Sequence, residues 1–594
     1  MRTIRKLALI ALALALVAAV WLWWNRPQPV DMTAYVPADS LVYLEANSLP
    51  QVVDGMIATD AWKRLAPLAG TGSGFSNIRW VSRLIAWTGI GPAEAVVLAR
   101  AQVAVTVLGF TAEEEAGDTL KIKPRAAIIV ESHSGTRRLR IAVEKLVGDF
   151  ARRAYLNPQV ERREADDVLL VTWSAPSGKR RIVAAVFESV AVIGNDDAAV
   201  QACLATRRGE RPSLVGNAQL EEMRSRVDSR DALAFGFVPP VGAAKLLEVA
   251  ATAYAGQLSP NPRIQSAAAI LLPQLANRIL GGAAWSMRVM DQLVEDRYFI
   301  ELDSDLAARL QTALTPVSDA SLRASELLPA MTHQLTSYTY QEPEAAWRGL
   351  NAAISSQLDA LSAPLVARFL EEALTPYGIE SPREFLRASG PELATARLDD
   401  TGQSTVLIAR VRNREALREQ VRRRLGSVTR ERIGNAEMMI SSNTKRGAAS
   451  FVGDHLIMGA ADDVRRCLAA QTEARALAAI DAFKRATQST AQAGSNAAPA
   501  GAVTYTDDRP GTRRFVDFVA AARRDRPADR AALERELLQI AYSRSETRLI
   551  ESGFERRTYS SFGQLGAITG QFAPETVMDQ ERLRPKVGRA ELGN

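Results

Sequence analysis

An internal repeat is the sequence feature that most constrains how this chain can fold. Residues 186–205 and 451–469 follow one pattern: an apolar strand, a glycine, an acidic pair and a Cys-Leu-Ala sequence. The chain of 594 residues contains only two cysteines, and each copy holds one of them, Cys203 in the first and Cys467 in the second. This shared order predicts that one architecture occurs twice in the chain.

The residues around the two copies predict the same order of elements: two strands, a helix and three more strands. In the first copy these elements are expected at 102–108, 125–131, 136–151, 168–172, 182–187 and 190–193. In the second copy they are expected at 393–398, 404–410, 414–425, 437–441, 448–452 and 455–458. An earlier strand is predicted to open each half, at 41–45 and at 336–340.

The first thirty residues predict a membrane anchor. Arg2, Arg5 and Lys6 precede an uncharged run of 18 residues, Leu7 to Trp24. As a helix this run extends about 27 Å, close to the hydrocarbon thickness of a bilayer. Basic residues before a span favour a cytosolic N-terminus, so we expect a single-pass protein of the cytoplasmic membrane whose bulk is extracytoplasmic. A cleaved signal peptide is the alternative, because the small residues at 17–19 resemble a cleavage site.

The fold class expected from these features is α+β, with an N-terminal transmembrane helix followed by a duplicated architecture of helices and a mixed or antiparallel sheet. The chain outside the anchor is longer than one domain usually is. The expected segments are a cytosolic basic end at 1–6, the transmembrane helix at 7–24, a linker at 25–32, a first α+β half at 33–316, a second α+β half at 321–575 and a polar tail at 576–594.

The charge balance argues against nucleic acid as a partner. The formal net charge is +6, and Arg2, Arg5 and Lys6 supply half of it. The charge left for the rest of the chain is about +3, which is far below the basic footprint of a nucleic-acid-binding protein.

The chain resembles a family of large, N-terminally anchored bacterial exported proteins that is classed as a domain of unknown function. The resemblance rests on Val36-Pro37-Ala38-Asp39-Ser40 before a strand, on the strand-glycine-acid-helix unit at 190–205 and 455–469, and on strands such as 232–237. It implies the architecture and the location described above. It implies no activity, because none is established for the family.

No residue pattern predicts a cofactor, a metal centre or a catalytic group. The histidines His133, His333 and His455 are far apart in the sequence, and neither HExxH nor a paired CxxC occurs. His133 lies between two serines, but the GxSxG elbow of a serine hydrolase is absent. We interpret the acidic pairs at 196–197 and 462–463 as helix caps rather than as catalytic acids.

The two cysteines are predicted to lie on the apolar faces of their helices. Val200, Cys203 and Leu204 follow the i, i+3, i+4 spacing of one helix face, and the second copy repeats this spacing. Two buried and unpaired thiols in two separate cores are therefore expected. A disulfide between the halves is the alternative, because pseudosymmetry can bring equivalent positions together in an oxidising compartment.

The segment from Ile78 to Trp87 contains the one interaction surface that the sequence indicates. As a helix it has two adjoining apolar stripes, and the second consists of Trp80, Leu84 and Trp87. The simpler interpretation buries both stripes in one domain. If only one stripe faces the core, Trp80, Leu84 and Trp87 are predicted to contact a partner, the membrane surface or the other half.

The function expected from these features is that of a membrane-anchored extracytoplasmic binding or scaffolding module of the bacterial envelope, with no reaction assigned. Its expected partners are the cytoplasmic membrane, through the N-terminal helix, and an envelope protein or lipid. A carrier of lipid or another apolar ligand is the first alternative, and a hydrolase with dispersed catalytic residues is the second. A carrier needs an apolar cavity, whereas a scaffold needs filled cores and an exposed apolar patch.

Overall fold

The computed structural model describes two long stretches of the chain. These are residues 29–68 and 94–570, apart from short gaps at 95–96, 99, 116–118, 156, 179, 259–261, 318–321, 359–361, 375–376, 473–474, 489–498 and 522–528.

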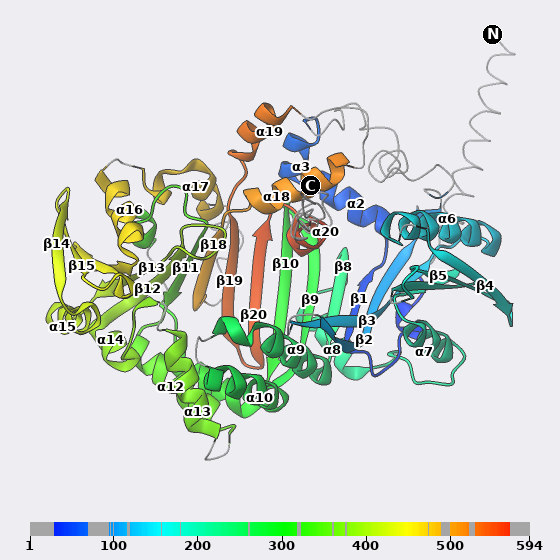
Figure 1. Ribbon diagram of the computed structural model, residues 1–594, viewed down its shortest axis with the longest axis horizontal. Helices are drawn as coiled ribbons and strands as arrows, with labels where there is room; N and C mark the ends of the chain where they lie inside the picture. The colour runs from blue at the N-terminus through cyan, green and yellow to red at the C-terminus, as the bar shows by residue number, and fades with distance from the viewer. Residues whose placement is uncertain are drawn as a thin grey trace, which may run out of the picture.

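One sheet of 20 strands runs through the molecule (Figure 1). The first half supplies β1 (Val42–Ala46), β2 (Gln102–Glu115), β3 (Thr119–Glu131), β4 (Gln159–Ala165), β5 (Val168–Ser174), β6 (Arg181–Phe187), β7 (Val190–Gly194), β8 (Ala234–Val238), β9 (Leu280–Met290) and β10 (Leu293–Leu302). The second half supplies β11 (Gln334–Thr339), β12 (Ser389–Arg397), β13 (Thr405–Val411), β14 (Val428–Ile433), β15 (Ala436–Ser441), β16 (Ala448–Val452), β17 (His455–Gly459), β18 (Ala502–Thr506), β19 (Ser543–Ile550) and β20 (Gly553–Ser560).

The two halves arrange their strands in the same order. From its outer edge to the centre, the first half runs β4, β5, β6, β7, β3, β2, β1, β8, β9, β10. The second half runs β14, β15, β16, β17, β13, β12, β11, β18, β19, β20. Each strand of the first half therefore has a counterpart whose number is larger by ten.

The halves join where β10 pairs with its counterpart β20. In this antiparallel pair Arg297 lies opposite Arg557, and the residues on either side pair symmetrically around them. A pseudo-twofold axis therefore passes between Arg297 and Arg557, at the centre of the sheet. Every strand pairing in the described part of the chain is antiparallel, so the mixed sheet that the sequence left open does not occur.

The predicted transmembrane helix requires a correction. Among the described residues, no helix is both long enough and apolar enough to cross a membrane. The longest, α6 (Thr136–Tyr155), has 20 residues but carries charged side chains along its length, and charges at the bilayer centre are costly. The segment 7–24 lies outside the described residues. The single-pass location and the cytoplasmic membrane as a partner are therefore not supported.

Helices cover both faces of the sheet. In the first half they are α2 (Leu49–Ala58), α3 (Asp60–Leu65), α6, α7 (Asp197–Arg207), α8 (Ala218–Arg226), α9 (Pro240–Leu258), α10 (Pro262–Ile279) and α11 (Ser304–Ala313). In the second half they are α12 (Pro343–Ser355), α13 (Ser362–Ala373), α14 (Pro382–Ala388), α15 (Arg414–Leu425), α16 (Ala461–Thr472), α17 (Asp481–Gln488), α18 (Arg509–Ala521), α19 (Arg530–Leu537) and α20 (Gly563–Gly570).

We call the face that carries Trp285 and Tyr298 the front face, and the opposite one the back face. On the front face, α2, α18 and the residues before α20 bury the ends of the central strands nearest the top of Figure 1. At the other end of these strands, α11 and α12 bury Leu549 and Phe554 together with Leu302. The middle of the front face lies between these two packed layers.

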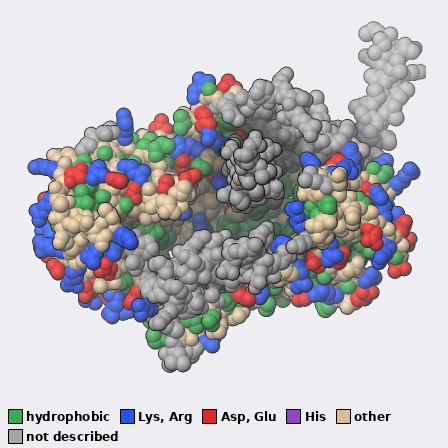
Figure 2. Space-filling view, in the orientation of Figure 1, with side chains coloured by type: hydrophobic (Ala, Val, Ile, Leu, Met, Phe, Trp, Pro, Cys, Tyr) green, Lys and Arg blue, Asp and Glu red, His purple; other side chains and the backbone are tan. Residues whose placement is uncertain are grey.

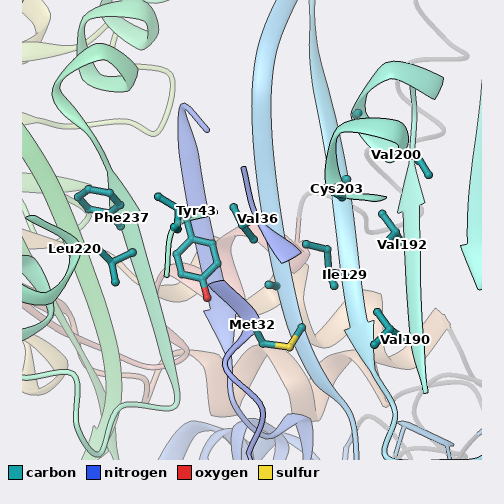
Figure 3. Close-up of a cluster of buried hydrophobic side chains, with 14 of the residues drawn as sticks. Met32, Val36, Tyr43, Ile129, Val190, Val192, Val200, Cys203, Leu220 and Phe237 are labelled. Carbon is teal, nitrogen blue, oxygen red and sulfur yellow. The ribbon is translucent and has the colours of Figure 1, made fainter. Parts of the chain in front are cut away.

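The back face holds the core that contains the first copy of the repeat. Tyr43 of β1, Ile129 of β3 and Val192 of β7 lie together there with Val200 and Cys203 of α7 (Figure 3). The second half has an equivalent core, in which α16 supplies Val464, Cys467 and Leu468. Alternating residues of each strand reach this face because side chains in a strand point in turn to opposite sides.

Both cysteines are free and buried. They belong to separate cores, so the disulfide between the halves does not form. Burial raises the pKa of each thiol to about 12, which keeps both protonated and unreactive near neutral pH. The prediction of two buried, unpaired thiols is confirmed.

Candidate functional site

The interaction surface indicated by the sequence cannot be placed. Trp80, Leu84 and Trp87 lie outside the described residues, so the prediction that they contact a partner stays a prediction.

The environment of His133 does not form a catalytic triad. Its Nε2 is 2.9 Å from Oε1 of Gln102, which occupies the place where a nucleophilic hydroxyl would be needed. The hydroxyl of Ser189 instead donates to Glu131 at 3.0 Å. Gln102 also accepts a hydrogen bond from the backbone N–H of Val30 at 2.8 Å. This cluster therefore ties the start of the described chain to the sheet.

The second half places a different polar cluster at the equivalent corner of the sheet. His455 is buried, with Nδ1 2.8 Å from Asp454 and Nε2 3.6 Å from Glu392. Across the described residues, no group of three or more His, Cys, Asp or Glu side chains is placed to hold a metal ion. Among the acidic pairs, Asp196 accepts a hydrogen bond from the Ala198 N–H at 2.7 Å and caps α7, as the sequence predicts.

The middle of the front face is hollowed. Figure 2 shows this hollow near the centre of the molecule, with hydrophobic side chains at its bottom. The strands β1, β8, β9, β10, β20 and β19 are consecutive neighbours in the sheet there. The side chains on the front face of these strands form the floor of this recess. We call the recess the central hollow.

One row of residues crosses the first half of this floor. Leu44 of β1 lies opposite Gly236 of β8, which lies opposite Trp285 of β9, which in turn lies opposite Tyr298 of β10. Ile300, two residues beyond Tyr298 on the same face, is 41% exposed, and Leu44, Trp285 and Tyr298 are partly exposed. The first half of the floor is therefore apolar and aromatic.

Gly236 allows the two large side chains beside it to approach each other. A Cβ atom built on Gly236 would lie 2.7 Å from the Leu44 side chain and 3.2 Å from Trp285. Any other residue would force one of these side chains to move, because contacts this short are repulsive. The glycine therefore makes room for a continuous apolar floor.

The counterpart row in the second half carries hydroxyl groups instead. Thr336, Thr504, Ser545 and Thr558 occupy the positions of Leu44, Gly236, Trp285 and Tyr298. The hydroxyls of Thr336 and Thr504 are 3.1 Å apart, and those of Ser545 and Thr558 are 2.8 Å apart. The front face of the sheet is thus apolar on one side of the pseudo-twofold axis and polar on the other.

Arg556 lies where the two kinds of floor meet. In the register of the central strands it is opposite Tyr298 on one side and Thr547 on the other. Its side chain is exposed, and its guanidinium donates a hydrogen bond to the Ser545 hydroxyl at 3.1 Å. Within the described part of the chain, Arg556 forms no ion pair.

Asp296 and Gln564 hold the two aromatic side chains of the floor through hydrogen bonds. Trp285 donates its indole N–H to Asp296 at 2.8 Å, and Tyr298 donates its hydroxyl to the side-chain oxygen of Gln564 at 3.2 Å. Asp296 also accepts a hydrogen bond from the backbone N–H of Gln564 at 2.9 Å, and Gln564 lies in the first turn of α20. Burial raises the pKa of Asp296 to about 6, although both N–H donors favour its charged form.

Comparison with known proteins adds no constraint. No protein-family model matches the chain, and neither a curated protein nor a solved structure matches it. The resemblance to a family of anchored exported proteins therefore stays a prediction.

Sequence reasoning did not identify the central hollow, although one signal of it is present. Arg288, Glu295 and Arg297 recur at the same spacing as Arg548, Glu555 and Arg557. That second repeat extends the duplication to the central hairpins. Alignment on it places Trp285 against Ser545 and Tyr298 against Thr558, which exposes the difference between the two halves of the floor.

Proposed function

We propose that this protein is a binding protein that holds an apolar ligand of the lipid class in the central hollow. The observation that carries the proposal is the partly exposed apolar floor formed by Leu44, Trp285, Tyr298 and Ile300. Proteins in water rarely expose several large apolar side chains side by side, and recesses lined by such side chains are typical of ligand sites.

The dimensions of the floor suit an extended hydrocarbon chain. Four inter-strand steps separate β1 from β20, which correspond to about 19 Å at the usual strand spacing. One leaflet of a bilayer holds acyl chains in about 15 Å of hydrocarbon. A single acyl chain can therefore lie across the strands from Leu44 to Arg556.

The energetics favour long chains over short ones. Each CH₂ group removed from water contributes about 0.8 kcal/mol, whereas association costs on the order of 4–15 kcal/mol in lost motion. Burial of about ten CH₂ groups contributes about 8 kcal/mol, which exceeds the lower part of that range. We therefore expect affinity to rise with chain length.

The surface outside the hollow offers less support for a protein scaffold. The most exposed large apolar side chains of the described residues are Val241, Met331, Ile270, Ile141 and Leu538. Of these, Val241 and Ile270 lie on helices that pack against each other, α9 and α10, and the other three belong to other segments of the chain. A protein interface usually requires such side chains to be contiguous. The recessed floor suits a small elongated ligand better than the flat surface of a protein partner.

The test replaces apolar residues of the floor in the first half by the polar residues found at the counterpart positions of the second half. A double variant, Leu44→Thr with Trp285→Ser, introduces the residues found at the counterpart positions Thr336 and Ser545. We expect the wild-type full chain to bind decanol, measured by titration calorimetry, and the double variant to bind it at least tenfold more weakly.

The matched control is Ile141→Ser, which removes an exposed apolar side chain of α6 that is 57% exposed. It should leave decanol binding unchanged. Circular dichroism should show that all three proteins are folded. Equal decanol affinity for the wild type and the folded double variant would contradict the proposal, as would no binding of decanol to the wild type.

A further inference from the structure

We infer that the ligand of the central hollow is an anionic amphiphile whose head group binds Arg556. This inference rests on the proposed function and adds to it the chemistry of the head group and the direction in which the ligand lies. The tail would extend over Trp285 toward Leu44, and the head would lie over β20.

The first support is that Arg556 differs from the other arginines of the central strands. On the back face, Arg288 and Arg297 both pair with Glu295, and Arg544 and Arg548 both pair with Glu546. Arg557, the next residue along β20, pairs with Glu555 at 2.7 Å. Arg556 alone among these six arginines makes no ion pair in the described part of the chain.

The counterpart position does not supply the missing charge. Asp296 occupies in β10 the place that Arg556 occupies in β20, and both lie on the front face. The carboxylate of Asp296 is buried and already accepts N–H groups from Trp285 and Gln564. It therefore serves the aromatic floor and the start of α20, and no ion pair joins it to Arg556.

The second support is the polarity of the floor along the direction of the ligand. Leu44 and Trp285 lie on the side of β1 and β9, whereas Thr547, Thr558 and Ser545 surround Arg556 on β19 and β20. A guanidinium has five N–H donors, and Arg556 uses one for Ser545. An apolar strip that ends at an exposed cation and hydroxyl groups complements a hydrocarbon tail with an anionic head.

The geometry favours an oxyanion with two acceptor atoms. Carboxylates and phosphates both accept two parallel N–H bonds from one guanidinium, and these charge-assisted bonds are about twice as strong as neutral ones. A fatty acid and a phosphate monoester of an alcohol share this chemistry. The experiment therefore includes both head groups on the same tail.

The experiment measures the affinity of the full chain for decanoate, decyl phosphate and decanol by titration calorimetry, below the concentrations at which these form micelles. We expect the wild type to bind at least one of the two anions about tenfold more tightly than decanol. Arg556→Gln should reduce the affinity for that anion about tenfold, to the level of decanol, and its effect on decanol, which carries no charge, should be much smaller. Arg556→Lys should retain part of the preference, since lysine keeps the positive charge but cannot donate two parallel hydrogen bonds to one oxyanion.

A matched control is Arg430→Gln on the edge strand β14, where Arg430 pairs with Glu437 at 3.3 Å and is well exposed. This variant should bind all three ligands like the wild type. The anion that binds more tightly would identify the source of the head group, a fatty acid or a phosphate ester.

The outcomes separate the inference from the proposed function. If Arg556→Gln binds the anions as tightly as the wild type does, or if decanol binds as tightly as both anions, the inference is overturned and the proposed function stands. If none of the three ligands binds to the wild type, the proposed function itself fails. Complete loss of the anion preference in Arg556→Gln, partial loss in Arg556→Lys and no loss in Arg430→Gln would support the inference.

Discussion

Equivalent positions of the two halves carry the same residues on the back face of the central strands and different residues on the front face. On the back face the same residues occupy equivalent positions, Arg288 and Arg548, Glu295 and Glu555, Arg297 and Arg557. On the front face Trp285 and Tyr298 have Ser545 and Thr558 as counterparts. Symmetric side chains surround the axis that joins the halves, whereas the asymmetric row lines the hollow. The back face therefore contributes matching pairings on both sides of the axis between the halves, and the front face is where the proposed site lies.

Glu295 and Glu555 provide the largest test of this comparison. Glu295 is fully buried and pairs with Arg288 and Arg297, and it accepts the Tyr559 hydroxyl at 3.1 Å. Replacement by Gln removes the buried carboxylate and leaves Arg288 and Arg297 paired only with the exposed carboxylate of Asp228. We therefore expect Glu295→Gln to lower the free energy of unfolding by about 3 kcal/mol, the lower end of the range for breaking a buried ion pair.

The matched variant is Glu555→Gln, at the counterpart position. The Glu555 side chain is 18% exposed, and water can replace part of its interaction, so we expect a loss of about 1 kcal/mol. Urea denaturation followed by circular dichroism measures both losses. Equal losses in the two variants would show that the halves depend equally on this face.

Asp296 provides a pH-dependent test. Its pKa is about 6 in the folded protein and 3.8 in the unfolded chain, so the folded state binds the proton more tightly. This contribution to stability is present in full well below pH 3.8 and is lost as the pH rises through about 6. Its full size is about 3 kcal/mol, of which about 2 kcal/mol is lost between pH 4 and pH 7. We expect the stability difference between the wild type and Asp296→Asn to change by that amount between pH 4 and pH 7.

The control for this measurement is the wild type itself across the same pH range. Its pH dependence also includes Asp508, whose pKa is raised by burial, and that part should persist in Asp296→Asn. Urea unfolding at each pH provides the data. A stability difference that is constant from pH 4 to pH 7 would refute the role assigned to Asp296.

Tyr298 tests how much one aromatic residue of the floor contributes to binding. Tyr298→Thr introduces the residue found at its counterpart, Thr558. The ring contributes about 1 kcal/mol of contact to a bound chain, so we expect decanol affinity to fall about fivefold. Thr558→Ser on the polar side should change it less than twofold, and the opposite order of effects would reverse the assignment of the apolar floor.

The hydroxyl row should show the smallest effect. Thr336 and Thr504 form a 3.1 Å hydrogen bond on the polar side of the floor, and both side chains are partly exposed. A double-mutant cycle with Thr336→Val and Thr504→Val is expected to give a coupling of about 0.5 kcal/mol. A coupling above about 2 kcal/mol would indicate that this row supports the fold as strongly as the back face does.

The outer part of each half could be predicted from the sequence. The strands expected at 448–452 and 455–458 correspond to β16 and β17, and the helix expected at 136–151 corresponds to most of α6. These elements have one strongly apolar face, which produces a clear period of two in strands and of 3.6 in helices. The buried cysteines followed from the same helical period.

The strands at the centre could not be predicted in this way. β19 and β20 place Arg and Glu side chains on the back face and Thr, Ser and Arg side chains on much of the front face. A strand that is polar on both faces has no alternation of apolar and polar residues. Its apolar signal is therefore weak, even though these strands join the two halves.

The sequence by itself determined the duplication and the burial of Cys203 and Cys467, because these depend on local spacing and on periodic apolar residues. Only the tertiary structure decided that the halves share one antiparallel sheet, and that Leu44, Trp285, Tyr298 and Arg556 lie in one row. These four residues are separated by up to 512 positions in the chain. Their proximity results from the register of backbone hydrogen bonds between distant strands, which no local pattern of residues specifies.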